Sequence, residues 1–106
     1  MSTPAIVIAA IAAINAGDTD AFLDLFEEAG TVDDWGTIYR GRAEIRRWSD
    51  RELIGARAHF TLKSSTQQGN LASMMVEVGG KGFNGPSRFT FDLDGAKVRR
   101  MKITAD

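Results

Sequence analysis

The sequence predicts an α+β fold in which a curved antiparallel sheet packs against three helices, all of them in the N-terminal half. Over most of the segment 5–53, apolar side chains recur at helical spacing, and glycines separate the helical stretches. In residues 56–104, apolar and polar side chains alternate, and turn dipeptides separate the alternating stretches. The chain has 106 residues, enough for one hydrophobic core but not for a second module. We therefore expect a single domain over residues 1–106.

Composition and charge exclude several classes of function. The chain has 13 basic and 14 acidic residues, and its net charge of −1 predicts no binding of nucleic acid or of an anionic membrane surface. It has one histidine and no cysteine, which predicts no metal site, and no motif indicates a cofactor. The apolar run at residues 5–14 follows no Lys or Arg and is shorter than the ~20 residues of a membrane span, so we expect a buried helix of a cytoplasmic protein.

Three helices are expected, each with its own start and stop signals. Thr3-Pro4 is typical of a helix start and Gly17 of its end. Asp18 caps a second helix, which Gly30 ends. Its apolar side chains recur at helical spacing, at Phe22, Leu25, Phe26 and Ala29. A third helix is predicted at residues 42–53, and its inward-facing side chains are Ile45, Trp48 and Leu53.

Six strands are expected, at residues 31–35, 37–40, 56–66, 71–83, 87–93 and 97–104. The turns between the last four strands set their register. A two-residue loop at Asn84-Gly85 pairs Phe89 with Gly80. A three-residue loop at residues 94–96 pairs Phe89 with Met101, and this register is favoured because a two-residue loop would place basic side chains beside the phenylalanines.

This register gathers apolar side chains on one face of the sheet, which we expect to line a pocket. The lining predicted from the strands is Met74, Val76, Phe89, Phe91, Met101 and Ile103. A two-residue turn at Gly69-Asn70 would bring His59 onto the same face. The other face then carries Phe60, Leu62 and Met75 among charged residues, and this apolar surface predicts a homodimer through the outer sheet face.

The stretch from Thr31 to Gly36 places carboxylates beside a large aromatic side chain at the pocket mouth. Apolar surroundings make a carboxylate a stronger base, so Asp34 is a candidate general base, while Asp33 points to solvent; the alternative is that Asp34 caps backbone N–H groups at a strand start. His59 is a candidate partner in an acid–base dyad, or else an exposed strand histidine. Aromatic pocket walls are expected from Trp35, Tyr39 and Trp48, unless Tyr39 and Trp48 pack as ordinary core.

Several motifs carry a family resemblance. They are Ile14 to Asp18 with Phe22 and Phe26, Val32-Asp33-Asp34, Tyr39 to Arg42 with Ile45, and Phe89 to Asp92 leading through Asp94-Gly95 into Lys97-Val98. With the order of elements, they make the chain resemble the nuclear transport factor 2-like superfamily, and within it the SnoaL-like polyketide cyclases and ketosteroid isomerases. The resemblance implies a cone-shaped, cystatin-like roll and places Asp34 where the isomerases have their proton-shuttling aspartate. The isomerases' two oxyanion donors have no counterpart, because they fall near Ala10 and on Phe89.

The expected function is binding of a small, mainly apolar molecule, with cofactor-free proton transfer of isomerase, cyclase or dehydratase type by Asp34, aided by His59. Such an enzyme predicts a cavity of roughly 300 Å³ or more that the Asp34 carboxylate lines. The alternative is a non-catalytic ligand-binding or dimerisation module of the same fold. A third possibility is a cavity that large aromatic side chains fill completely.

Overall fold

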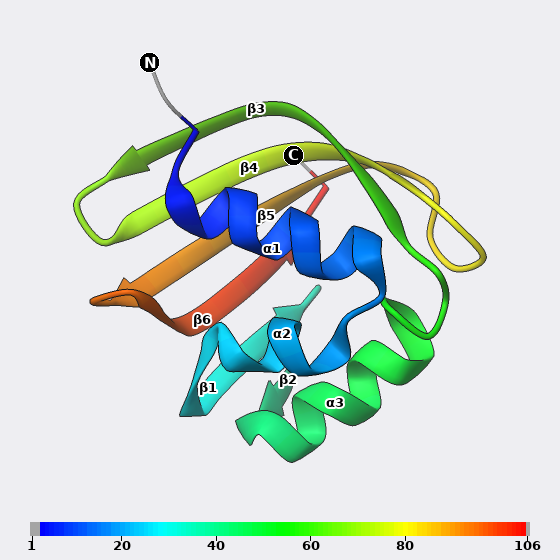
Figure 1. Cartoon of the computed structure of the whole chain (residues 1–106), viewed down its shortest axis with the longest axis horizontal. Coiled ribbons are helices and arrows are strands. Elements are labelled where there is room, and N and C mark those ends of the chain that lie inside the picture. The colour runs from blue at the N-terminus through cyan, green and yellow to red at the C-terminus, as the bar shows by residue number, and fades with distance from the viewer. Residues whose placement is uncertain (1–2, 106) are drawn as a thin grey trace.

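The computed structural model describes residues 3–105, over which the chain forms three helices and six strands (Figure 1). The helices are α1 (Ala5–Ala16), α2 (Thr19–Asp24) and α3 (Gly41–Glu52). The strands are β1 (Phe26–Asp34), β2 (Thr37–Arg40), β3 (His59–Gln68), β4 (Leu71–Gly79), β5 (Gly85–Asp94) and β6 (Lys97–Thr104). They form one curved, unclosed sheet in the order β2-β1-β6-β5-β4-β3, in which only β1 and β6 are parallel neighbours. The predicted α+β fold class is confirmed, apart from this parallel pair.

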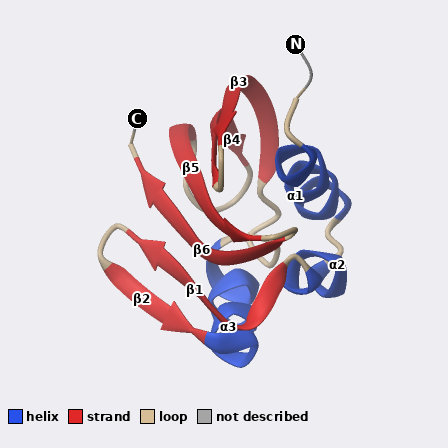
Figure 2. Cartoon of the chain, turned by 90° about the vertical axis from the view of Figure 1, so that its left-hand side faces the viewer, coloured by secondary structure: helices blue, strands red, loops and turns tan. Residues whose placement is uncertain are grey.

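The helices cover one face of the sheet, and the hydrophobic core lies between the two layers (Figures 1 and 2). α1 packs across β3 and β4, whereas α3 packs against β1 and β2. Fully buried side chains from both layers meet in the core, among them Val7, Phe22, Val32, Ile45 and Val98. Within the described residues, no helix is both long and apolar enough to cross a membrane.

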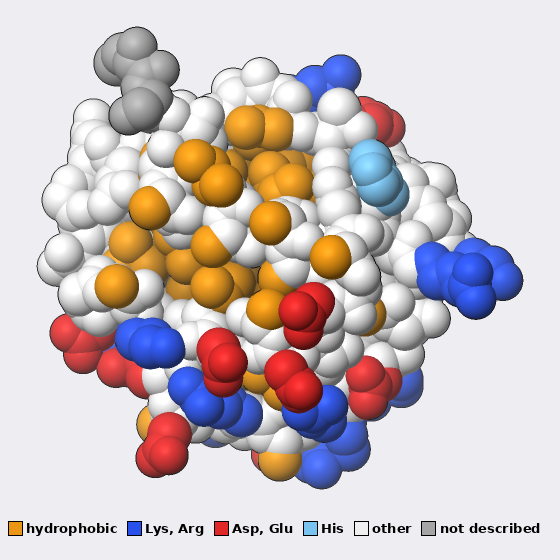
Figure 3. Space-filling model, in the orientation of Figure 1, with side chains coloured by type: hydrophobic (Ala, Val, Ile, Leu, Met, Phe, Trp, Pro, Cys, Tyr) orange, Lys and Arg blue, Asp and Glu red, His pale blue; other side chains and the backbone are white. Residues whose placement is uncertain are grey.

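The first helix ends where the sequence predicted, but it begins one residue later, at Ala5, and the predicted cap from Thr3 is replaced by Pro4 in the N-cap position. Pro4 stands immediately before it, and Gly17 ends it with a φ of 68°, a left-handed conformation that favours glycine. The helix carries no charged side chain, and its outward-facing Ile8 is 57% exposed. Apolar side chains therefore gather on the molecular surface over α1 (Figure 3).

The second helix is shorter than predicted. Asp18 caps it as expected, because its Oδ1 accepts a 3.0 Å hydrogen bond from a backbone N–H of the first turn. The helix then ends at Asp24 rather than near Gly30, and β1 begins at Phe26. Phe26 pairs with Val98 of β6 and is fully buried. This tertiary pairing outweighs the helical spacing of the sequence.

β1 and β2 form a tight hairpin at the stretch that contains the candidate base. Its turn residues Trp35 and Gly36 both have positive φ, 54° and 94°, as a two-residue type I′ turn requires. Asp33 Oδ1 accepts a 2.8 Å hydrogen bond from Gly36 N, which closes the turn. Asp34 pairs with Thr37 and projects from the opposite face of β1.

The β4–β5 and β5–β6 hairpins have registers other than those predicted. The side chains that were predicted to face inward on these strands nevertheless do so. Phe89 pairs with Met74 and Ile103, and the predicted partners Gly80 and Met101 were wrong. The two registers differ from the predicted ones by six and two residues. Both differences are even, so each side chain stays on its expected face of the strand.

The β4–β5 connection is a longer loop, and Asn84-Gly85 is not a two-residue turn. The loop spans residues 80–84 and docks on the segment that precedes β3, where a loop N–H donates a 2.8 Å hydrogen bond to Ala56 O. Gly80 has a φ of 132°, and a Cβ on it would stand 2.5 Å from Arg57 O. Only glycine permits this close approach between Gly80 and Arg57. The contact holds the loop against the segment before β3, so β4 and β5 are not joined by a tight two-residue turn.

A bulge in β3 places His59 on the outer face, so the prediction of a pocket histidine was wrong. The Gly69-Asn70 turn has the predicted two residues, but the register shifts after Leu62. A shift of one residue exchanges the two faces of the strand. His59 is consequently exposed (Figure 3), whereas Phe60 points inward and is only 2% exposed.

Asn15 of α1 fixes Phe60 in this position. Its Oδ1 accepts a 2.7 Å hydrogen bond from Phe60 N, and its Nδ2 donates a 3.0 Å hydrogen bond to Phe60 O. β3 is an edge strand, so at Phe60 these two backbone groups have no neighbouring strand to bond. The Asn15 amide takes the place of that strand and ties α1 to β3.

The bulge also reduces the apolar content of the outer face. Phe60 and Leu62 lie on the inner side, because they pair with Val78 and Val76, and only Met75 of the three predicted apolar residues lies outward. Apart from Met75 and the exposed Leu71 of β4, the outer face is largely polar. There Asp92 accepts a 3.0 Å hydrogen bond from Arg99, and this bond and the attraction between the two charges raise the pKa of Arg99.

Candidate ligand-binding site

A cavity of about 240 Å³ opens between the β1–β2 turn, the end of α3 and the inner face of the sheet. It is smaller than the roughly 300 Å³ expected of an enzyme pocket, but the aromatic side chains do not fill it completely. Its lining consists of Asp34, Trp35, Trp48, Glu52, Leu53, Ala58, Phe60, Val78, Gly82, Phe83, Ser87, Phe89 and Ile103.

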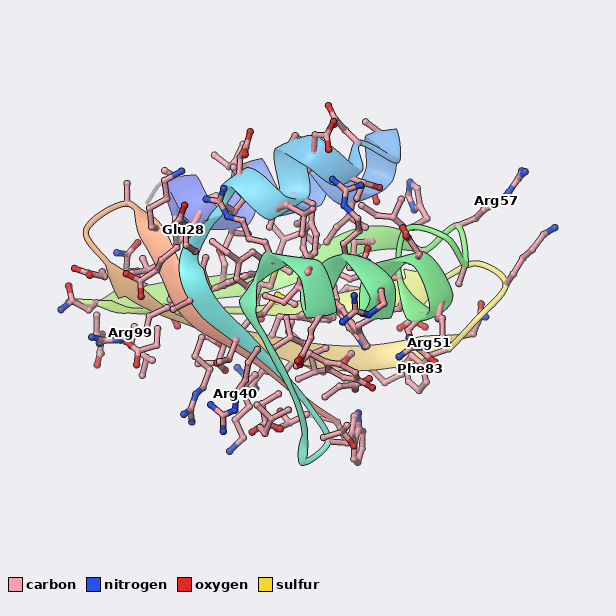
Figure 4. All side chains as sticks on the ribbon, turned by 90° about the horizontal axis from the view of Figure 1, so that it is seen from below. Glu28, Arg40, Arg51, Arg57, Phe83 and Arg99 are labelled. Atoms are coloured by element: carbon pink, nitrogen blue, oxygen red, sulfur yellow. The ribbon has the colours of Figure 1, made fainter. Side chains whose placement is uncertain are left out.

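The aromatic side chains of the lining divide into a rim and a floor. On the rim, Trp35 of the β1–β2 turn is 65% exposed and Phe83 of the β4–β5 loop is 55% exposed. Figure 4 shows Phe83 beside the end of α3. The floor is formed by Trp48, Phe60 and Phe89, which are 2%, 2% and 3% exposed. A ligand would therefore meet aromatic surface both at the mouth and at depth.

Asp34 stands at the end of β1 and is held there by α3. The indole Nε1 of Trp48 donates a 3.0 Å hydrogen bond to Asp34 Oδ2. Among the described residues, no hydrogen bond reaches the other carboxylate oxygen, Oδ1. The half-buried carboxylate is thus fixed through one oxygen while the other remains available.

Tyr39 packs against Trp48 and does not line the cavity. The two rings lie 6.1 Å apart at an angle of 34°. The Arg51 guanidinium stands 5.9 Å from the centre of the Tyr39 ring. Tyr39 therefore acts as core packing that positions the indole, which was the alternative to a pocket wall.

The ionisable side chains of the lining are two carboxylates, Asp34 and Glu52. Neither takes part in an ion pair within the described residues, where the pairs are Arg42–Asp24, Arg46–Asp20 and Arg99–Asp92. Over the same residues, no group of three His, Cys, Asp or Glu side chains is arranged to hold a metal ion. The cavity thus combines apolar walls with uncompensated negative charge.

The structure brings together about half of the predicted site residues. Those that line the cavity are Asp34, Trp35, Trp48, Phe89 and Ile103. Four others, Met74, Val76, Phe91 and Met101, share the predicted face but belong to the buried core and not to the lining. His59 lies on the outer face, so it forms no dyad with Asp34.

The sequence prediction missed some lining residues, although the sequence pattern could have indicated two of them, Glu52 and Ser87. Glu52 follows Trp48 by four residues in one helix, which places both on the same helical face. Ser87 has the strand parity of Phe89. Phe60 was assigned to the wrong face, because a bulge leaves no clear mark in the sequence. Phe83 was taken as part of a strand, although it lies in a loop.

Comparison with known proteins gives a consistent picture. A family model of the SnoaL-like domain matches residues 7–102. A candidate polyketide cyclase from Sinorhizobium meliloti is 25% identical with a TM-score of 0.82, over 95% of this chain and 94% of that one. A Catenulispora acidiphila protein with a ketosteroid isomerase-like fold, in complex with trimethylamine, is 25% identical with a TM-score of 0.83, over 97% and 86%.

More distant structures share the fold alone. The epoxide hydrolase/cyclase-like enzyme SalBIII, which has a role in pyran ring formation in the polyether salinomycin, is 20% identical with a TM-score of 0.82, over 95% of this chain and 88% of that one. No curated protein is significantly similar in sequence to this chain.

Proposed function

Because the chain belongs to the SnoaL-like domain family, we propose that its cavity binds a small, mainly apolar molecule and that Asp34 acts there as a general base in cofactor-free proton transfer. The observation that carries the proposal is the position of the Asp34 carboxylate. It lines an aromatic cavity and is fixed through Oδ2 by the indole of Trp48. A base needs such a fixed orientation and an unshared oxygen to accept a proton from a bound molecule.

In the proposed step, a C–H proton of the ligand moves to Asp34 Oδ1 and the electron pair stays on the ligand. The hydrogen bond from Trp48 holds the carboxylate in place as its charge is neutralised. The buried floor of Trp48, Phe60 and Phe89 keeps water from the reacting carbon. The protonated Asp34 can then return the proton to another atom of the same molecule, which completes an isomerisation without a cofactor.

A specific observation favours the second candidate function, non-catalytic binding. Proton abstraction beside a carbonyl needs donors for the developing oxyanion. Ser87 lines the cavity, but its Oγ donates to Thr104 O over 3.1 Å, and the Trp48 indole already donates to Asp34. The remaining side-chain donor of the lining is the Trp35 indole on the exposed rim.

One experiment separates the two functions. The probe is 1-tetralone, a small apolar ketone, incubated with the protein in D₂O. Tryptophan fluorescence reports binding, because both tryptophans of the chain line the cavity. We expect quenching, together with protein-dependent deuterium exchange at the carbon beside the carbonyl, measured by proton NMR. In Asp34→Asn the quenching should persist and the exchange should stop.

Asp33→Asn is the matched control, because it removes the neighbouring charge while keeping an oxygen acceptor for the turn. It should retain both binding and exchange. Binding without exchange in the wild-type chain would establish the non-catalytic function instead. Absence of quenching by 1-tetralone and by a wider panel of apolar molecules would overturn the proposal.

Two further expectations stay predictions. Homodimerisation through the outer sheet face rests on less apolar surface than the sequence indicated, and this surface includes Met75 and the 54% exposed Leu71 of β4. Location in the cytoplasm likewise stays a prediction.

A further inference from the structure

We infer that the molecule bound in the cavity carries a positive charge, as a small organic amine or quaternary ammonium ion with apolar substituents. This rests on the proposed function, because it names the ligand class of the same cavity. It does not require that the ligand be turned over.

The charge distribution of the lining is the first reason. Asp34 and Glu52 come from different elements, β1 and α3, and both line the cavity. Within the described residues, neither is neutralised by an ion pair, and the lining includes no Lys, Arg or His. Charges of one sign in a cleft with apolar walls focus their field into that cleft. The field favours a cation and opposes an anion.

Two arginines that are adjacent in sequence to lining residues are directed elsewhere. Arg51, adjacent to Glu52, stands over the Tyr39 ring and donates to Arg47 O over 3.3 Å. Arg57, adjacent to Ala58, extends away from the body of the molecule (Figure 4). These two side chains therefore do not supply the counter-charge that the carboxylates lack.

The aromatic lining is the second reason. A cation with apolar substituents binds well against the faces of aromatic rings, and Trp is the best of these partners. The cavity has two tryptophans and three phenylalanines, on both its rim and its floor. An uncharged apolar ligand would use the rings but would gain nothing from the charge of the two carboxylates. A cation uses both features.

A positive charge on the ligand would also assist proton transfer. Apart from the Trp35 indole on the exposed rim, the lining offers a developing negative charge no free side-chain donor, because Ser87 and Trp48 already donate elsewhere. A cationic nitrogen next to the reacting carbon would stabilise that charge from within the ligand. The ligand would then supply the electrophilic group that the protein does not.

The test uses three probes of matched shape and different charge: choline, the uncharged 3,3-dimethylbutan-1-ol, and the anion 3,3-dimethylbutanoate. Dissociation constants come from tryptophan fluorescence at low ionic strength. We expect choline to bind at least about tenfold more tightly than the alcohol, by analogy with desolvated cation–π sites. The anion should bind most weakly.

Charge-removing variants complete the test. Asp34→Asn and Glu52→Gln should each weaken choline roughly fivefold and leave the alcohol unchanged, since one partly screened Coulomb contact is lost. Asp33→Asn and Asp50→Asn are controls of equal charge, because neither residue lines the cavity. They should leave all three constants unchanged.

Each outcome is decisive. Equal binding of choline and the alcohol, or insensitivity of choline to both lining substitutions, would overturn the inference while leaving small-molecule binding intact. Tighter binding of the anion would also overturn it. If none of the three probes binds, the inference fails, and the separate 1-tetralone experiment then decides whether the proposed function fails with it.

Discussion

The indole of Trp48 donates a hydrogen bond from Nε1 to Oδ2 of Asp34 over 3.0 Å. The two residues are separated by the β1–β2 turn, β2 and most of α3, so the bond ties the helix to the end of the first strand. Trp48 is 2% exposed, and its N–H would otherwise be buried without a partner. The bond therefore contributes to stability and also orients the candidate base.

Replacement of Trp48 by Phe should affect both properties. Trp48→Phe removes the donor and leaves a small void, and we expect it to lower the free energy of unfolding by about 2–3 kcal/mol. Asp34→Asn keeps an oxygen acceptor for the indole, so we expect it to cost less than about 1 kcal/mol. Urea denaturation measures both. Equal costs for the two variants would show that the hydrogen bond does not hold Asp34.

Asn15 and Phe60 form the second contact that shapes the site, and its removal gives a further prediction. Asn15→Ala leaves the N–H and C=O of Phe60 without partners, at an expected cost of about 1–2 kcal/mol. Gln67→Ala is the control, because Gln67 donates to Gly69 O from an exposed position and should cost less than about 0.5 kcal/mol. A cost for Asn15→Ala no greater than the control's would contradict the role we assign to it.

These two contacts also explain how far the sequence could predict the site. Asp34 was placed correctly because alternation along β1 separates it from Asp33, and the turn chemistry of Trp35-Gly36 confirms that alternation. Phe89 and Ile103 were placed correctly because their registers differed from the prediction by even numbers of residues. The local pattern therefore determined these faces even where the pairing was wrong.

His59 and Phe60 show why the rest was beyond prediction. The bulge after Leu62 exchanges their faces, and Phe60 is held in its position by two hydrogen bonds with Asn15, which is 45 residues away in sequence. In the same way, the end of α2 depends on pairing between Phe26 and Val98. Long-range partners of this kind leave no periodic signal in the segment that they reshape.

Gly80 positions the loop that carries Phe83, and its substitution tests that role. With a φ of 132° and a Cβ that would stand 2.5 Å from Arg57 O, Gly80→Ala should cost about 3 kcal/mol or more, from backbone strain and overlap. Gly69→Ala is the control. Its φ is 58° and nothing lies within 4 Å of the added Cβ, so we expect a cost of only about 1–2 kcal/mol.

Thermal denaturation measures both glycine variants. Gly80→Ala should in addition move the fluorescence of the two tryptophans, because the displaced loop changes the cavity mouth. If Gly80→Ala were as mild as Gly69→Ala, the loop would have to rearrange easily, and the rim position of Phe83 would not be fixed by this contact.

The last prediction concerns association of the chain through its outer sheet face. We expect a homodimer at micromolar concentration, with the half-buried Met75 near the centre of the interface. Met75→Glu should shift the chain to monomer, because moving a carboxylate from water into an interface core costs free energy even when it has a charged neighbour. The fold should be retained, since the new Glu would stand opposite Arg88 on β5 and can pair with it.

Ile8→Asp is the matched control on the other side of the molecule. Ile8 is 57% exposed on the apolar face of α1, so its replacement should leave the dimer intact. Light scattering at several concentrations distinguishes the cases. If Ile8→Asp dissociates the dimer and Met75→Glu does not, the chain associates through α1, and the outer-face prediction is wrong. A wild-type chain that is monomeric throughout the concentration series would contradict dimerisation through either face.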